Sequence, residues 1–323
     1  MEQGKLRFEY QLNKVTQLVA QANTQADAGM WLLTNDLRTP MFMLESLAKM
    51  NAKIYHKKTF EKLLLKFKAL EDALGALDYY VTIDKQFAGN KKIATPIKIF
   101  ITSKISLHAL ALNKLLVNDN WLNGKRIAKI NKKLSTVKWY KPSKEIEKIN
   151  AFYTTEIAKI IDFVLQNKFE FTDVELGVHE LRRKIRWLSI YPHALQGVVK
   201  LQATKPIAPA LKKYLMPEIV NSKYNTLPAL VNDNQYLGIN QASFFALSWL
   251  IAELGKIKDA GLALYALKEA LQSTTKLNEK EALTKAYTLV TPKTTIAELL
   301  KTANGITKTF FTEDNLTQLL VAK

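Results

Sequence analysis

The chain contains no cysteine, and this excludes disulfide bonds, thiolate metal ligands and cysteine nucleophiles. Histidine is nearly as scarce, and no two of the four residues have the spacing of metal ligands: His56, His108, His179 and His193. Glycine-rich phosphate loops, His-Glu-x-x-His patterns and nucleophile elbows are missing as well. We therefore expect a protein without metal or cofactor that is not an enzyme.

The sequence also lacks the long apolar segments that would indicate a signal peptide or a membrane span. The first residues, MEQGKLRFEYQLNK, lack the apolar centre of a signal peptide. No uninterrupted apolar run reaches the length that a membrane span needs. These absences predict a cytoplasmic protein without a membrane span.

Strand and hairpin signals are few, whereas helical periodicity is nearly continuous. Alternating patterns are almost absent, and an Asn-Gly pair occurs once, at Asn123-Gly124. Apolar residues recur every three or four positions through residues 59–81 and 241–272. Hydrophobic residues make up 48% of the chain, which is enough to build a core. The sequence predicts an all-α fold.

Acidic residues are outnumbered, with 29 Asp and Glu against 47 Lys and Arg, a net charge of +18. Residues 85–148 alone hold 15 basic and 3 acidic side chains, an excess of 12. Within this segment Lys125, Lys129, Lys132 and Lys133 share one helical face. The excess indicates an anionic partner, such as nucleic acid, an acidic membrane surface or another polyanion, although most lysines of this kind are simply solvated.

A second concentration of charge lies in the run from Val178 to Arg186. Read as a helix, it places four basic side chains at i, i+3, i+4 and i+7 on one face: His179, Arg182, Arg183 and Arg186. Their mutual repulsion needs a compensating partner. A polyanion lying along the face would supply one, because guanidinium groups match the geometry of phosphate oxygens.

The surrounding residues predict the limits and the inner face of this basic helix. Thr172 followed by Glu175 has the spacing of a capping box that opens it, and Tyr191-Pro192 is expected to close it. The opposite face is apolar and predicted to be buried, with Leu181, Ile185 and Leu188. Glu180 cannot serve His179 as an acid–base partner, because adjacent helical residues do not face each other.

A weak internal repeat suggests a duplication. Residues 31–38 can be aligned with residues 175–182, an offset of 144, and residues 74–78 with residues 254–259, an offset of 180. The difference, 180 − 144 = 36, predicts an insertion in the second half, in the proline-rich stretch from Thr204 to about Asn240.

These features resemble the CHAD family, the conserved histidine α-helical domain. The resemblance rests on His179-Glu180-Leu181-Arg182 with Arg186 one turn further, and on Leu254-Gly255 followed by Asp259. It implies two helical bundles related by a pseudo-twofold and the binding of inorganic polyphosphate in a basic cavity between them. By resemblance His179, Arg182 and Arg186 contact phosphate, and Arg183 joins them on the helical pattern alone.

The sequence departs from the family pattern at several positions. Ser189 stands where a further basic residue is usual. In the first repeat Asn35 replaces the histidine, Phe42 and Glu45 replace arginines, and Arg38 alone keeps its type. Pro40 is expected to kink or restart the first helix.

Together these patterns predict two antiparallel helical bundles in a degenerate tandem repeat. The expected segments are residues 1–150, residues 151–290 and a short helical tail of residues 291–323, with the boundary between about 145 and 170. The expected function is non-enzymatic binding of polyphosphate by the basic helix. The expected contributors from the first half are Arg38, Lys125, Lys129 and Lys133.

Two alternatives stay open. A nucleic-acid-binding protein would explain the charge, and Trp139 and Tyr140 lie among lysines where they could stack on bases, although packing on the core is favoured for both. A scaffold with a decayed polyanion site would explain the loss of cations from the first repeat. An acidic membrane surface is less favoured, because the basic helices need their apolar faces for the core.

Overall fold

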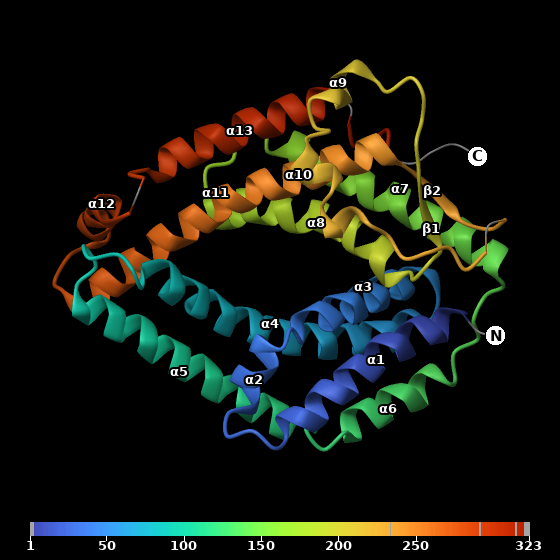
Figure 1. Ribbon diagram of the computed structural model, residues 1–323, viewed down its shortest axis with the longest axis horizontal. Coiled ribbons are helices and arrows are strands. Elements are labelled where there is room, and N and C mark those ends of the chain that lie inside the picture. The colour runs from blue at the N-terminus through green and yellow to red at the C-terminus, as the bar shows by residue number, and fades with distance from the viewer. Residues whose placement is uncertain (1–2, 233, 291, 314, 320–323) are drawn as a thin grey trace. The chain divides into compact units, whose positions relative to one another are not determined.

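The computed structural model describes residues 3–232, 234–290, 292–313 and 315–319. Within them the chain is built from thirteen α-helices, one π-helical and one 3₁₀ segment, and two four-residue strands (Figure 1). The predicted all-α class is confirmed. The relation of two bundles by a tandem repeat stays a prediction.

The chain divides into two compact units that are not consecutive in sequence. Unit 1 comprises Met1–Lys141 and Ala266–Leu289, and unit 2 comprises Pro142–Tyr265 and Val290–Lys323. The first change of unit therefore lies just before the expected boundary. The second falls inside a single helix, α11 (Gln241–Thr274), which no break in helical periodicity marks in the sequence.

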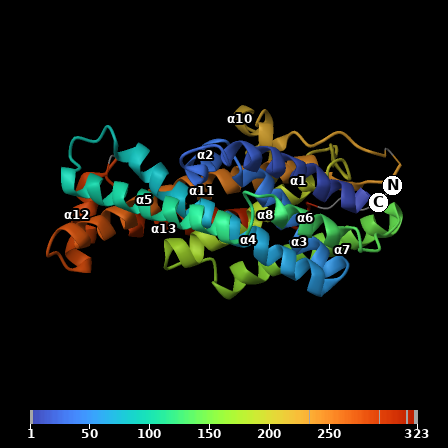
Figure 2. The ribbon, with the colours of Figure 1, turned by 90° about the horizontal axis from the view of Figure 1, so that it is seen from below.

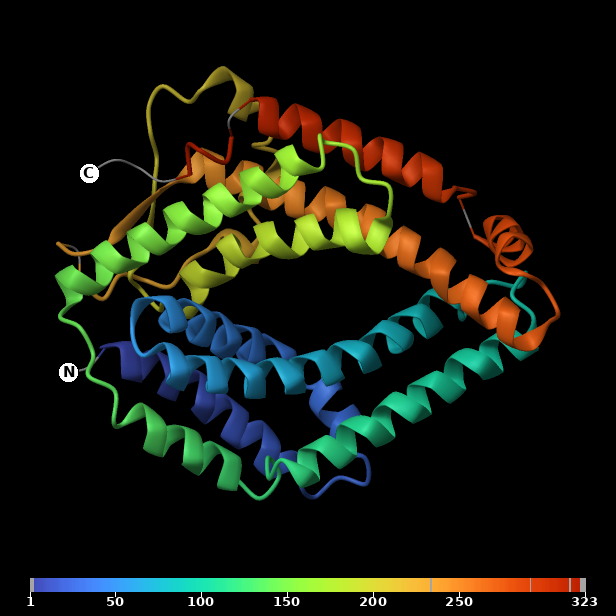
Figure 3. The same ribbon diagram turned by 180° about the vertical axis from the view of Figure 1, so that it is seen from behind.

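Unit 1 is an assembly of helices around the long helix α4. Its helices are α1 (Gln3–Ala22), α2 (Ala28–Thr34), α3 (Arg38–Ile54), α4 (Lys57–Phe87), α5 (Thr95–Asn118), α6 (Lys125–Leu134), the end of α11, and α12 (Glu279–Leu289). α4 packs on both α3 and α5, and a short connection joins α4 to α5 in a helical hairpin (Figure 3). Its buried residues recur at helical spacing and form the core: Phe60, Leu63, Phe67, Leu70, Leu74 and Leu77.

Unit 2 contains the basic helix. Its elements are α7 (Pro142–Gln166), a π-helical segment (Val174–His179), α8 (Glu180–Ala194), β1 (Val199–Gln202), α9 (Pro209–Lys212), α10 (Pro217–Val220), a 3₁₀ turn (Lys223–Asn225), β2 (Leu237–Asn240), the first part of α11, and α13 (Ile296–Thr312). β1 pairs in parallel with β2, Val199 opposite Leu237. The proline-rich stretch predicted as an insertion runs between these strands.

The segment expected as a helical tail carries α13, which groups with unit 2. Thr295 and Glu298 form a capping box that starts α13. The side chain of Asn304 accepts a hydrogen bond from the Phe171 amide at 2.9 Å and donates to the Phe171 carbonyl at 3.1 Å. These contacts attach α13 beside the start of the basic helix. Residues 291, 314 and 320–323 of the expected tail lie outside the described residues.

Among the described residues one helix, α5, is long and apolar enough on average to span a membrane. The search for uninterrupted apolar runs did not find it, because polar residues interrupt its sequence. α5 has a window of 18 residues with a mean hydropathy of 1.2. A single helix of this kind is weak evidence of a span, so the expected absence of a span stays a prediction.

Candidate anion-binding site

The basic helix begins with a π-helical segment rather than with the predicted capping box. Asp173, not Thr172, is the cap: its backbone is extended, and its carboxylate accepts a hydrogen bond from the Leu176 amide at 2.7 Å. The wider π-helical turn runs as far as His179, and α8 follows without interruption. π-helical turns occur often at functional sites.

The end of the basic helix also differs from the prediction. α8 continues through Pro192 to Ala194, so Tyr191-Pro192 does not close it. The helix can run past the proline because the Leu195 amide bonds the Tyr191 carbonyl at 2.9 Å and completes the last turn around it. The helix therefore gains about one turn after the expected end.

The predicted division of α8 into two faces is confirmed. Leu181, Ile185 and Leu188 are fully buried. The basic residues lie outside this buried face, but the structure gives them different surroundings and not one uniform stripe.

His179 is paired with an acidic residue that the sequence reasoning overlooked. Its Nδ1 lies 2.9 Å from the Oε1 of Glu175, one turn earlier. The hydrogen bond from His179 holds the pKa of Glu175 below its usual value, against the opposing effect of burial. An ionised carboxylate only accepts, so Nδ1 carries the proton in this contact and Nε2 is the nitrogen left for a ligand. The i, i+4 spacing was the available signal.

Arg182 is half-buried, and only part of its guanidinium is hydrogen-bonded. Its Nε donates to the Ile251 carbonyl of α11 at 3.1 Å. Burial lowers the pKa of Arg182, and the nearby charge of Asp259 works in the opposite direction. Among the described residues no carboxylate lies within ion-pair distance of this side chain. Arg182 therefore keeps donors that no acidic side chain of the described chain neutralises.

Arg183 and Arg186 extend the face to the following turn. Arg183 is 59% exposed and pairs with Glu180 at 2.5 Å, an exposed contact of small energetic value. Lys184 shares the same carboxylate at 3.1 Å. Arg186 is half-buried. Glu175 and Glu180 therefore offset part of the positive charge of the basic helix, which the sequence pattern alone indicated to be unpaired.

Glycine 255 makes room for Arg182. A Cβ atom at this position would lie 3.0 Å from the Nε and 3.2 Å from the Nη2 of Arg182. Gly75 has a similar neighbour in unit 1, because a Cβ atom there would lie 3.0 Å from the Nη2 of Arg38.

A Gly255→Ala variant is expected to displace Arg182 and lose its bond to Ile251. Alanine gains about 1 kcal/mol of helix propensity over glycine, and the lost hydrogen bond costs about as much, so the free energy of unfolding should hardly change. The matched control is Gly305→Ala in α13, where nothing lies within 4 Å of the added Cβ. Urea denaturation should show the control stabilised by about 1 kcal/mol. Equal stabilisation of both variants would contradict the close packing on Arg182.

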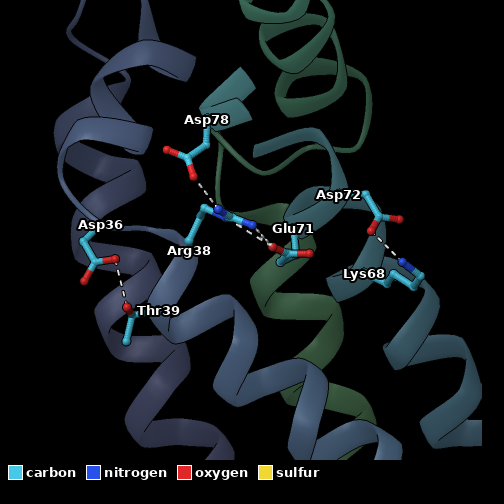
Figure 4. A network of polar contacts seen from close by, with 7 residues as sticks. All are labelled: Asp36, Arg38, Thr39, Lys68, Glu71, Asp72 and Asp78. Carbon is cyan, nitrogen blue, oxygen red and sulfur yellow. Dashed lines mark hydrogen bonds and ion pairs between the residues drawn. The ribbon is translucent and has the colours of Figure 1, made fainter. Parts of the chain in front are cut away.

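Arg38, expected as a phosphate contact from the first half, is neutralised by its own unit. The helix restarts at Arg38, two residues before Pro40, as the proline indicated. Figure 4 shows its guanidinium between two carboxylates of α4: Nη2 lies 2.6 Å from Glu71 Oε1, and Nη1 lies 2.6 Å from Asp78 Oδ2. Both arms of the fork are occupied, so we correct the expectation and remove Arg38 from the candidate site.

The two arginines nevertheless occupy parallel settings. Arg38 packs on Gly75, and Arg182 packs on Gly255. Each Nε donates to the residue four positions before that glycine, to the Glu71 side chain in unit 1 and to the Ile251 carbonyl in unit 2. The main difference is that Glu71 brings a carboxylate and Ile251 does not.

Glu45 makes this part of unit 1 still more acidic. Its side chain is buried, with 6% exposed. Burial, and next the charge of Glu71, raise the pKa of Glu45 to about 7. The surroundings of Glu45, Glu71 and Arg38 in unit 1 are therefore unsuited to an anion.

The lysines of α6 are exposed as a group. Ile127, Ile130 and Leu134 form the buried face of this helix. Lys125, Lys129 and Lys133 lie outside this face and are exposed. They lie in unit 1, whereas the basic helix lies in unit 2. Their surroundings are those of solvated lysines that contribute charge without a built site.

The aromatic residues between the lysines pack inside unit 1, as favoured from the sequence. Trp139 lies against Phe8, Tyr55 and Phe60, with ring centroids 6.2, 5.2 and 5.9 Å apart. Tyr140 stacks on Tyr55 at 4.6 Å. Both rings are half-buried and contribute to the packing of unit 1.

Comparison of the chain with known protein families, with curated proteins and with solved structures found no match. Among the described residues no group of three or more acidic or histidine side chains could hold a metal ion. The chemistry available in unit 2 is therefore that of arginine and histidine donors beside two glutamates, which suits the binding of an anion.

Proposed function

We propose that this protein is a non-enzymatic polyanion-binding module whose ligand is inorganic polyphosphate, bound by the basic helix of unit 2. The observation that carries the proposal is the state of Arg182. Its Nε is fixed by the Ile251 carbonyl, and no described carboxylate pairs with the rest of its guanidinium. A fixed and under-neutralised arginine is preorganised for an oxyanion.

The physical cost of burying Arg182 supports the same ligand. Burial lowers the pKa of Arg182, which means that the surroundings disfavour its positive charge. A bound phosphate would supply the missing negative charge and two parallel hydrogen bonds. Arg38 needs no such partner, because Glu71 and Asp78 already provide both.

The neighbouring groups fit successive phosphates of one chain. His179 offers Nε2, since Nδ1 faces Glu175, and Arg183 and Arg186 follow on the next turn. A phosphate would compete with Glu180 for Arg183, at low cost because Arg183 is 59% exposed and Glu180 would keep its pair with Lys184. Lys125, Lys129 and Lys133 would add long-range attraction.

Nucleic acid is the weaker candidate. Its sequence-based support was the pair Trp139 and Tyr140, and both rings pack against other aromatic residues of unit 1. Binding of nucleic acid would therefore depend mainly on phosphate contacts, which polyphosphate provides without bases or sugars.

The proposal is tested by titrating the whole protein with long-chain polyphosphate at several salt concentrations. Three to four neutralised phosphates predict that affinity falls about 20- to 50-fold between about 50 and about 200 mM salt. Isothermal titration calorimetry would measure this dependence, as would a fluorescence titration in which light scattering is used to check for aggregation.

Competition in the same assay separates the candidates. Polyphosphate should displace single-stranded and duplex DNA from the protein at equal phosphate concentration. Absence of polyphosphate binding at low salt would sink the proposal, and preferential binding of DNA would favour the nucleic-acid alternative.

A further inference from the structure

Helix α5 carries large apolar side chains on its outward face. Ile99, Leu107, Leu110 and Val117 are 64%, 57%, 69% and 61% exposed. Ile99, Leu110 and Val117 are separated by 11 and 7 residues and so lie nearly in line along the helix, with Leu107 beside them. We call these four residues the α5 stripe.

The stripe is not needed for the core, because the opposite face of α5 already supplies it. Ile101, Leu112 and Leu116 are buried, and this face packs against α4. Figure 2 shows α5 as one unbroken helix. Only 22% of its most apolar window is buried, in contrast to a core helix of comparable hydropathy. An outward apolar row of this length calls for a partner.

The charge that α5 and the residues just before it carry has one sign. From residue 85 to residue 118 the chain contains six lysines and no acidic residue. Lys91 and Lys92 are exposed just before α5 begins, and the exposed Lys114 lies between Leu110 and Val117 on the stripe face. An apolar row on a helix whose own charged residues are all cations matches a surface that is apolar beneath and anionic above.

We propose that α5 docks unit 1 on an anionic lipid surface, lying in the plane of the interface with the α5 stripe inserted among the acyl chains. The lysines would meet the headgroup phosphates while their stems lie along the apolar layer. A second copy of the chain is a poorer occupant, because two α5 helices meeting stripe to stripe would bring their lysines together, and neither helix carries a carboxylate to pair with them.

The contacts of α5 favour this placement over a membrane span. A spanning α5 would have to leave α4 and break the ion pair of Lys104 with Glu269, whose nitrogen and oxygen lie 2.7 Å apart. An in-plane helix keeps both. The sequence-based argument against an acidic membrane, that the basic segments need their apolar faces for the core, is therefore wrong for α5, which has apolar residues on both faces.

Vesicle co-sedimentation tests the proposal. The full-length protein should bind vesicles that contain phosphatidylserine, and phosphatidylcholine vesicles at least tenfold more weakly. The triple variant Ile99→Ser/Leu110→Ser/Val117→Ser should lose at least tenfold in binding, since three side chains no longer enter the apolar layer. All three positions are exposed, so circular dichroism should show an intact fold.

Matched variants in unit 2 provide the control. Leu165→Ser/Tyr224→Ser/Val231→Ser changes side chains of similar exposure, 54%, 68% and 59%, outside the basic helix, and should bind vesicles like the wild type. Both triple variants should keep their affinity for polyphosphate, which makes this result independent of the function proposed above.

A label reports the depth directly, because the chain has no other cysteine. An environment-sensitive dye on Leu110→Cys should shift to shorter wavelength with anionic vesicles, and the same dye on Val231→Cys should not. Equal vesicle binding by the stripe variant and the wild type would overturn the proposal. So would resistance to carbonate extraction, which indicates a span, or an oligomer that the stripe substitutions dissociate, which indicates a second copy.

Discussion

A Glu45→Gln variant is expected to be more stable than the wild type by about 3 kcal/mol at pH 8 and nearly equal to it at pH 4, because a shifted pKa costs about 1.4 kcal/mol per unit. The pKa of Glu45 is raised from 4.5 to about 7 by burial and by the charge of Glu71. Between these values the folded chain holds a proton that the unfolded chain releases. The stability contributed by Glu45 is therefore complete below pH 4.5 and is lost as the pH rises through about 7.

Urea denaturation across this pH range measures the effect as a difference between variant and wild type, so the titration of other groups cancels. Glu147→Gln on the exposed side of α7 removes the same charge and serves as the control. It should change stability by less than about 0.5 kcal/mol at every pH. A stability gain for Glu45→Gln that does not depend on pH would contradict a protonated Glu45.

An Arg38→Ala variant is expected to lose about 2–3 kcal/mol of stability while keeping its affinity for polyphosphate. The loss arises because Glu71, whose side chain is 11% exposed, would stay buried without its cation and close to Glu45. The Asp78 arm is 40% exposed and contributes less.

Two further variants separate this effect from a general loss of charge. Adding Glu71→Gln to Arg38→Ala should restore part of the stability, because the uncompensated charge is removed. Lys68→Ala breaks the exposed pair with Asp72 that Figure 4 shows nearby, and should cost less than about 0.5 kcal/mol. A weakened affinity of Arg38→Ala for polyphosphate, with the fold intact, would return Arg38 to the binding site.

The helices and their buried faces could be predicted from the sequence, because apolar spacing reports directly which side of a helix is covered. The burial of Leu181, Ile185 and Leu188 is an example. The ends of the helices could be predicted less well. Thr172 and Asp173 are both good caps, and only the backbone decides between them.

The state of the charged residues could not be predicted from the sequence. Arg38 and Arg182 are aligned when residues 31–38 are laid on residues 175–182, and no local pattern says that one is paired with carboxylates and the other is not. The difference comes from residues far along the chain, a glutamate at position 71 and an isoleucine carbonyl at position 251. The division into units was hidden for a related reason, since α11 passes from one to the other without a break.

The measurement that tests the central claim most directly is the polyphosphate affinity of two double variants with equal charge. Arg182→Ala/Arg186→Ala alters the proposed site, and Lys301→Ala/Lys308→Ala removes two exposed cations of α13 in the same unit. We expect the first to lose about 100-fold in affinity at low salt, because it removes two charged hydrogen-bonding groups. The second should lose less than about threefold. Equal losses in both would show that net charge alone attracts the polyanion, and an unchanged affinity in the first would contradict the site.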